Sequence, residues 1–506
     1  MNEDNNMRIV SSRVNGAPRC DRRLGRVTLC ALAGTLALTG CSLAPPHQTP
    51  PLPVASQYPA DTGESSGLVS AGNLAPEIAW RNFFADPQLR ALIAQALENN
   101  RDLKTAVLRV AEARAAYGIQ RADQFPTIAA GIDGSRTRTP ADLSTTGRAL
   151  IAEQYQVGVG LAAWELDFWG RVRNLKEAAL ESYLATDAVR HAVTMSLIAQ
   201  VADAYFGLLE LDERLALARQ TVASRDESLR IFTRRFEVGA IARMDVVQVD
   251  TLLQQARTLV AQLEQGRAAQ VHALTLLLGA PLPEDLQTTK LDDLAVPQAM
   301  PIGLPAEVLL QRPDIVAAEH QLRAAGANIG AARAAFFPRI TLIGSFGTAS
   351  AELDGLFDTG SRAWRFAPSL SLPIFDAGRN RAALELAEVR RDLAVVNYEK
   401  SVQAAFRDVS DALSARQWLG EQVCIAEATL KAQAERVRLV KLRYDNGSAP
   451  YFEWLDAQRD LLTAEQQWVQ ARRALLASLV RLYAALGGGS QDIIAASPAS
   501  LVRTNP

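Results

Sequence analysis

The chain has 506 residues, with 53 Lys and Arg against 55 Asp and Glu, and its formal net charge at pH 7 is −2. This near-neutral balance excludes a strongly basic nucleic-acid-binding protein, so we expect no nucleic-acid partner. The four histidines lack metal-ligand spacing, and the sequence has no phosphate-binding loop, nucleophile elbow or dinucleotide-binding glycine motif. We therefore expect no metal site, no catalytic residue and no enzymatic activity.

The first 40 residues have the features of a bacterial lipoprotein signal peptide. Several arginines precede an apolar stretch, Val27–Leu38, which at 12 residues is too short to span a bilayer as a helix. It ends in Leu38-Thr39-Gly40-Cys41, which resembles a lipobox, the motif whose cysteine is acylated after the chain is cut before it. We predict that residues 1–40 are removed, and that Cys41 carries a diacylglycerol thioether and an N-acyl chain such as palmitate. The alternative is an uncleaved signal anchor.

The segment after Cys41 indicates where the protein is sent. Ser42, rather than Asp, follows the cysteine, which in lipoproteins of this kind implies sorting to the outer membrane. Residues 42–60 are rich in Pro and polar groups, so we expect residues 41–84 to form a lipidated, extended tether. The mature chain keeps one other cysteine, Cys424, in a helical pattern that predicts a buried, inert thiol.

The rest of the chain contains the same layout twice. A helical pattern from Asp102 ends at Phe125-Pro126, and a second one from Asp314 ends at Phe337-Pro338, with an offset of 314 − 102 = 212 residues. Each copy predicts the order helix-strand-strand-helix-helix. The predicted boundaries are 85–279 for the first repeat, 280–305 for an equatorial linker, 306–488 for the second repeat and 489–506 for a flexible tail.

Two strands are expected in each repeat. In the first, 127–138 follow the Phe125-Pro126 break, and 155–167 then show apolar residues at every second position. In the second repeat, 340–347 and 366–374 show the same alternation. Each segment has roughly the 10 residues of a tilted transmembrane strand. One face is apolar and the other is small and polar, which suits a membrane barrel with a water-filled lumen. The alternative is a pair of soluble hairpins on a helical bundle, and Pro368 is awkward within a strand.

Two very long helices are also expected. Residues 171–236 contain no Pro and almost no Gly, and 379–444 mirror them. A helix of this length would reach about 100 Å at 1.5 Å per residue, which indicates coiled-coil helices, although an antiparallel bundle core would show the same periodicity. Both end in a turn with the pattern Arg, aromatic, acid, any residue, Gly, and a glycine there suits the left-handed end of a helix.

Four strands are too few for a membrane barrel. The smallest barrels have about eight strands, and an open sheet edge in lipid leaves backbone groups unpaired. The chain is therefore expected to share its barrel with copies of itself. A dimer would supply eight strands, whose interior side chains would fill, so a conduit favours a trimer with twelve.

Several motifs resemble the outer membrane factor family, in its NodT-type, TolC-like lipoprotein branch. Residues 303–319 are similar to the signature GLP…LL…RPDI…AE, and 164–171 to the motif that begins Trp-Glu-Leu-Asp and ends Gly-Arg. Two further similarities are 329–332 leading into Phe337-Pro338, and Phe375-Asp376-Ala377-Gly378-Arg379. The resemblance covers about residues 42–488.

The resemblance implies a mainly α protein with a membrane β-barrel segment. Three copies would form a 12-stranded outer-membrane barrel continued by a periplasmic α-helical barrel. The homotrimer would act as the passive exit duct of a tripartite efflux system for small toxic compounds, with a periplasmic adaptor and an inner-membrane pump of the resistance–nodulation–division type. Two alternatives are a conduit for type I protein secretion and a lipid-anchored periplasmic coiled-coil scaffold without a pore.

The resemblance also places the adaptor-docking tip and the gate at the two hairpin turns. Asp445 is the best candidate for an acidic gate ring, with Arg443 and Tyr444 as ties between neighbouring helices. The residues expected at the docking tip are Arg235, Phe236, Gly239, Arg443, Tyr444 and Gly447.

Overall fold

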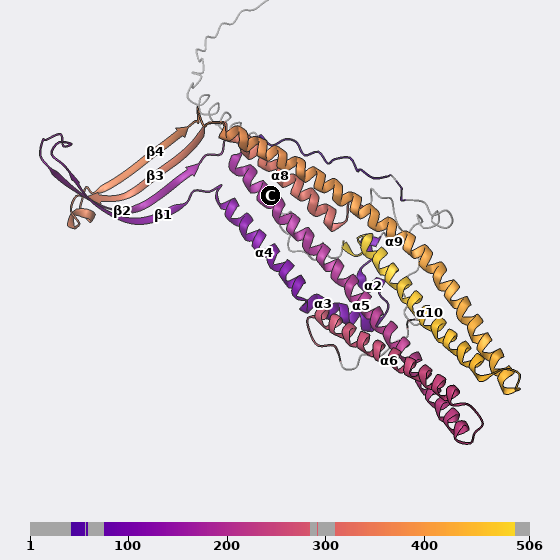
Figure 1. The fold of residues 1–506 in the computed structure, drawn as a ribbon. Coiled ribbons are helices and arrows are strands. Elements are labelled where there is room, and N and C mark those ends of the chain that lie inside the picture. Colours follow the sequence, from indigo (N-terminus) through magenta and orange to yellow (C-terminus); the bar gives the residue numbers. More distant parts are fainter. Residues whose placement is uncertain (1–41, 56, 59–74, 284–290, 292–308, 491–506) are drawn as a thin grey trace, which may run out of the picture. The chain divides into compact units, whose positions relative to one another are not determined.

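The structure is a computed structural model that describes residues 42–55, 57–58, 75–283, 291 and 309–490. The predicted signal peptide, Cys41, and most of the predicted linker and tail lie outside the described residues. Both halves of the sequence follow the order helix, two strands, two helices, as expected (Figure 1). The chain also divides into two compact units, one that contains the four strands and one that contains most of the helices. The elements are η2 Ala75–Glu77, α2 Trp80–Phe83, α3 Pro87–Asn99, α4 Arg101–Ala122, β1 Ile128–Thr139, β2 Leu150–Glu165, α5 Arg171–Glu237, α6 Arg243–Leu278, α8 Pro313–Ala334, β3 Arg339–Ser350, η4 Asp354–Phe357, β4 Arg362–Ser371, α9 Arg379–Asp445 and α10 Tyr451–Ala485.

Matching helices in the two halves have equal lengths. Helices α4 and α8 each have 22 residues, and α5 and α9 each have 67, so the prediction of two very long helices is confirmed. Among the described helices, α5 alone contains an 18-residue stretch apolar enough to cross a membrane, with a mean hydropathy of 1.4. Because 67% of that stretch is buried inside the protein, packing against other helices accounts for its composition.

The four strands form one antiparallel sheet in the order β1-β2-β3-β4, which leaves β1 and β4 at its edges (Figure 1). The expectation of four strands is confirmed, but four of their ends are wrong. Strand β2 begins at Leu150 rather than 155, β3 continues to Ser350, and β4 runs from Arg362 to Ser371. Pro368 does lie within β4, the last strand of the sheet in one chain, where it is paired with Leu342 of β3.

The register of the sheet separates an apolar face from a small, polar face. Directly paired residues share a face, so the pairs Ile132↔Val157 and Phe346↔Trp364 place large side chains on one side. The other side carries the pair Gly158↔Gly347 in the centre. A Cβ atom on Gly347 would lie 2.1 Å from the carbonyl oxygen of Val157, so these strands approach too closely for any side chain there.

Charged and aromatic contacts join the two repeats where the strands meet the helices. Glu165, at the end of β2, accepts two hydrogen bonds from Arg171, at 2.9 and 2.7 Å, and forms an ion pair with Arg339, at the start of β3, at 2.7 Å. The Trp169 ring stacks on Phe337 with 4.7 Å between centroids, and its indole N–H donates to the carbonyl of Pro338. These contacts explain the composition of the motif at 164–171 in physical terms.

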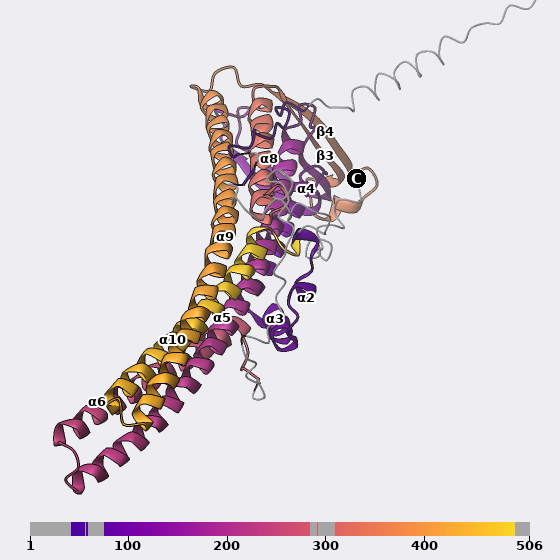
Figure 2. The ribbon, with the colours of Figure 1, turned by 90° about the vertical axis from the view of Figure 1, so that its right-hand side faces the viewer.

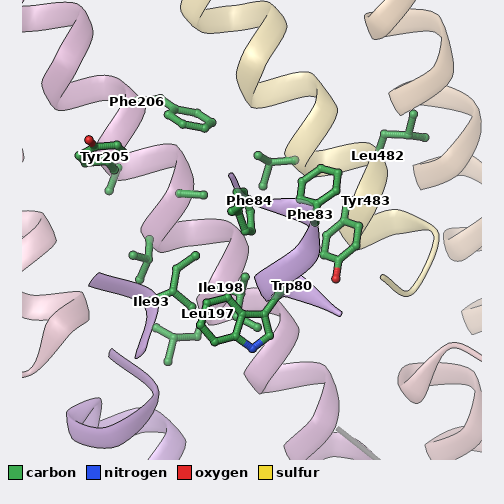
Figure 3. Close-up of a cluster of buried hydrophobic side chains, with 14 of the residues drawn as sticks. Trp80, Phe83, Phe84, Ile93, Leu197, Ile198, Tyr205, Phe206, Leu482 and Tyr483 are labelled. Atoms are coloured by element: carbon green, nitrogen blue, oxygen red, sulfur yellow. The ribbon is translucent and has the colours of Figure 1, made fainter. Parts of the chain in front are cut away.

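The core of the helical unit lies between α2, α3, α5 and α10 (Figure 3). Phe83, which is 1% exposed, stacks on Tyr483 with 4.1 Å between ring centroids. Trp80 and Phe84 are also buried. Residues 75–84 therefore belong to the core and not to a tether, because large aromatic side chains bury their surface where helices can cover it. Nearer the N-terminus, Tyr58 stacks on Phe406 at 5.2 Å.

Within the helical unit, each long helix pairs with a shorter antiparallel one. Helix α10 runs beside α9 in both views, and α6 lies beside α5 (Figures 1 and 2). Ion pairs such as Arg436–Asp460 at 2.7 Å and Arg219–Glu264 at 3.0 Å connect the partners. The prediction that Cys424 is buried is wrong, since this thiol is exposed on α9. Its position is on a part of the helix surface that α10 does not cover.

Two polar side chains join helix ends in the middle of the helical unit. Asn100 caps the start of α4 by accepting from the N–H of Leu103, and its amide donates to the carbonyl of Leu277 near the end of α6, both at 2.9 Å. In the second repeat, Arg312 donates to the carbonyl of Ala485 at the end of α10, at 2.7 Å. A carbonyl near the end of α6 is thus satisfied by the residue that precedes α4, and one at the end of α10 by the residue that precedes α8.

Candidate functional site at the helical hairpin ends

The turns α5–α6 and α9–α10 have the same backbone structure. Gly239 has φ +76° and Gly447 has φ +71°, both in the left-handed region. The N–H of each glycine donates to the carbonyl of the aromatic residue three positions earlier, at 2.9 Å in both turns. The next N–H donates to the arginine carbonyl five positions earlier, at 2.9 Å for Arg235 and 2.8 Å for Arg443. This double pattern satisfies the last carbonyls of each long helix.

The first hairpin end exposes apolar side chains. Phe236 is 42% exposed, Val238 73% and Met244 76%, although large apolar side chains are usually buried. Arg235 lies over the ring of Phe232, with 6.0 Å between its guanidinium carbon and the ring centroid. Three large, exposed apolar side chains at one hairpin end are typical of a surface that binds another protein.

The second hairpin end is held by charged contacts. Arg443, in the last turn of α9, forms an ion pair with Glu453 in the first turn of α10, at 2.5 Å. Asp445 pairs with Lys441 one turn earlier in the same helix, at 2.9 Å, and remains half exposed. Tyr444 stacks on Trp454 with 5.9 Å between ring centroids. Arg443 and Tyr444 therefore connect α9 to α10, whereas Asp445 contacts its own helix.

Contacts between the two hairpins lie one to three helical turns away from the two glycines. The hydroxyls of Ser228 and Tyr451 are 2.6 Å apart, and Phe232 packs on the Tyr451 ring at 4.7 Å. Phe232 is 4% exposed and Leu455 is 1% exposed in the same small core. At the turn itself, the guanidinium of Arg235 lies 3.5 Å from the Tyr444 hydroxyl, at the limit of a hydrogen bond.

A buried arginine sits in this junction. Arg225 is 3% exposed and donates to the carbonyl of Leu455 at 3.0 Å, while its other terminal nitrogen has no hydrogen-bond partner among the described residues. Burial lowers the pKa of the Arg225 guanidinium and raises the pKa of the Tyr451 phenol, because both charged forms lose water. The hairpins are thus packed around a desolvated cation, and desolvation of a charge opposes the favourable contacts that the charge makes.

The six residues predicted for the tip all lie at the two hairpin ends, and the structure brings Arg235 close to Tyr444. Sequence reasoning missed the side chains that join the hairpins, namely Arg225, Ser228, Phe232, Tyr451 and Leu455. The dense aromatic run 451–454, directly after the second turn, was the one available signal for them. No group of His, Cys, Asp and Glu side chains suited to a metal ion occurs among the described residues.

Comparisons with known proteins agree with this architecture. A family profile described as Outer membrane efflux protein matches residues 92–280 and 304–488. The toluene efflux pump outer membrane protein TtgF of Pseudomonas putida is 45% identical over 469 residues, which cover 92% of this chain and 97% of TtgF. The outer membrane protein OprJ of Pseudomonas aeruginosa is 42% identical over 466 residues, covering 91% and 95%.

Solved structures show the same fold. The open state of the Neisseria gonorrhoeae MtrE outer membrane channel has a TM-score of 0.81 at 40% identity and covers 89% of this chain and 98% of MtrE. The Campylobacter jejuni CmeC outer membrane channel has a TM-score of 0.82 at 26% identity, with coverage of 92% and 98%. With matches across both repeats, this chain belongs to the outer membrane efflux protein family.

Proposed function

We propose that three copies of this chain form an outer-membrane channel that serves as the passive exit duct of an efflux pump. The observation that carries the proposal is the four-stranded sheet with two unpaired edges and an exposed apolar face. Three copies would supply 3 × 4 = 12 strands, enough to close a barrel around a water-filled lumen and leave no edge in lipid.

The hairpin ends are the proposed docking surface for a periplasmic adaptor, which would connect the duct to an inner-membrane pump of the resistance–nodulation–division type. The exposed Phe236, Val238 and Met244 support an apolar contact with the adaptor. Relatives named for toluene efflux and antibiotic efflux support small toxic compounds as cargo. The channel itself would supply no energy, and the pump would select the cargo.

Planar-bilayer recording of the purified protein tests the pore. We expect discrete conductance steps, together with a trimer band in an unheated SDS gel that collapses to a monomer on heating. A lipid-anchored scaffold without a pore would give neither result. A strain that lacks the gene should accumulate toluene or a dye, and a copy of the gene on a plasmid should restore export.

We further propose that Cys41 is the lipid anchor. Cys41→Ser should abolish incorporation of labelled palmitate and leave the precursor uncut, because no thiol remains to be acylated. Stable anchoring needs more than one acyl chain, and Cys41 would carry a diacylglycerol on its sulfur and a further acyl chain on its amino group. Cys424→Ser, which removes the exposed cysteine of α9, is the matched control and should label like the natural chain. Full palmitate labelling of Cys41→Ser would refute the assignment.

The contact between the hairpins should control opening of the tip. Tyr451→Phe removes the 2.6 Å hydroxyl contact with Ser228, and a lost hydrogen bond of about 1 kcal/mol corresponds to a roughly fivefold higher open probability in single-channel records.

Asp445→Ala and Arg443→Ala test the acidic ring and its tie. If both leave conductance and cation selectivity unchanged, the gate assignment of these residues is wrong.

A further inference from the structure

The apolar face of the sheet changes character toward one end. Every strand joins a helix at one end, and the strands are connected in pairs at the other end by turns 140–149 and 351–361. On strand β1, the apolar face carries Ile128 and Ile132 near the helix-joined end, and they are 70% and 81% exposed. Beyond Ile132, the next residues on the same face of β1 are Gly134, Arg136 and Arg138, at every second position.

An arginine occupies the corresponding end of β4. Arg362 pairs with Thr348, and Trp364 pairs with Phe346, so both β4 side chains share the apolar face with Ile132. The guanidinium carbon of Arg362 lies 6.0 Å from the centroid of the Phe346 ring. Trp364 is 74% exposed beside it. An aromatic residue followed by a cation is the arrangement expected where hydrocarbon gives way to lipid headgroups.

These arginines are incompletely neutralised within the chain. Arg136 forms an ion pair with Glu153 on β2 at 2.8 Å, and its side chain is still 70% exposed. Arg138 and Arg362 are exposed and have no carboxylate within ion-pair distance among the described residues. On this face the strands thus carry 3 − 1 = 2 uncompensated positive charges near the turns. The carboxylates of Glu352, Asp354 and Asp358 belong to the β3–β4 turn and not to the strands.

The arginines lie on the two edge strands of the sheet. Arg136 and Arg138 are on β1 and Arg362 is on β4. When copies of the sheet close into a barrel, β4 of one copy must pair with β1 of the next. That pairing places all three arginines at the same end and on the same face of each seam between copies, although they lie on opposite edges in one chain.

We propose that Arg136 and Arg138 of one copy and Arg362 of the next bind the phosphate groups of membrane lipids in the leaflet at the turn end of the barrel. This rests on the proposed function, because the seam exists only in the assembled channel. Guanidinium groups bind phosphate oxygens through paired, charge-assisted hydrogen bonds, and the apolar side chains below them would contact the acyl chains. In an outer membrane, that leaflet would present a phosphorylated glycolipid.

Lipid retention by the purified trimer tests the site. Detergent-solubilised protein is incubated with lipid A, which carries two phosphates, or with chemically dephosphorylated lipid A, and bound lipid is counted by native mass spectrometry. The natural chain should retain the phosphorylated form at least tenfold better. The triple variant Arg136→Gln, Arg138→Gln, Arg362→Gln should lose this preference.

Arg365→Gln is the matched control, because Arg365 lies three residues from Arg362 on the same strand but on the opposite face. It should retain lipid A like the natural chain. Equal retention by the triple variant, or equal binding of the dephosphorylated lipid by the natural chain, would overturn the proposal. Bilayer conductance of each protein distinguishes the lipid site from the channel. If the triple variant conducts normally and also retains lipid A normally, the lipid site alone is rejected. If the natural chain shows no conductance, the channel itself is rejected.

Discussion

Replacing Gly347 with valine should abolish the heat-resistant trimer and the efflux that depends on it. A Cβ at this position would lie 2.1 Å from the carbonyl oxygen of Val157 and 2.5 Å from the Cα of Gly158, so strands β2 and β3 would have to separate. This is the pairing that joins the two repeats of the chain. Within a bilayer, each backbone group that loses its partner costs several kcal/mol, so the loss of a few bonds is sufficient to prevent closure.

Gly160→Val is the control for this change. Gly160 lies on the same strand and the same face as Gly158, but its added Cβ would meet the nearest atom, the carbonyl oxygen of Gly344, at 3.7 Å, an ordinary contact. Unheated SDS gels of outer-membrane fractions should show a trimer for Gly160→Val and none for Gly347→Val. A normal trimer with normal dye export in Gly347→Val would show that the two strands have room for a side chain here.

The helices were predictable from local features of the sequence. Long stretches without Pro and with one internal Gly each, bounded by Gly170 and Gly239 in the first half and by Gly378 and Gly447 in the second, predict two helices of about the observed length. The reason is that helix formation depends on propensity and on breakers close in sequence. The duplication adds a check, because each half repeats the same boundaries.

The strand ends were harder to predict, since charged side chains interrupt the alternation. The first part of β2 contains Glu153 on the apolar face, where it pairs with Arg136 of β1. Arg362 similarly obscures the start of β4. A polar residue at an apolar position looks like the end of a strand until its cross-strand partner is known, and the partner is set by tertiary structure.

The candidate site was predictable only in its backbone. A glycine after an aromatic residue and an acid indicates the left-handed end of a helix, and both turns have that conformation. The contacts between hairpins join residues far apart in the chain, such as Ser228 and Tyr451, which are separated by 223 positions. No periodicity within one segment reports such a contact. The contact of Asp445 is different in kind, because its partner Lys441 lies four residues earlier on the same helix, a spacing at which opposite charges meet.

Asn100→Ala should destabilise the helical unit by about 2–4 kcal/mol, since it removes a helix cap and leaves a partly buried carbonyl without its donor. Asn100 is 4% exposed, and its side chain accepts from the N–H of Leu103 and donates to the carbonyl of Leu277. Water cannot easily replace the buried bond to Leu103. Thermal unfolding of the purified protein, followed by circular dichroism at 222 nm, should show a Tm lower by roughly 5 °C.

Asn100→Ser separates the two contributions of this side chain. Serine can still cap α4 through its hydroxyl oxygen, but it is too short to reach Leu277, so about half of the loss should remain. Arg312→Ala tests the equivalent junction of the second repeat, where the bond to the carbonyl of Ala485 is lost. If the junctions act independently, the losses in Tm of Asn100→Ala and Arg312→Ala should add in the double variant. A Tm unchanged in Asn100→Ala would mean that the packing of α3, α5 and α6 around the junction holds these helix ends without the amide.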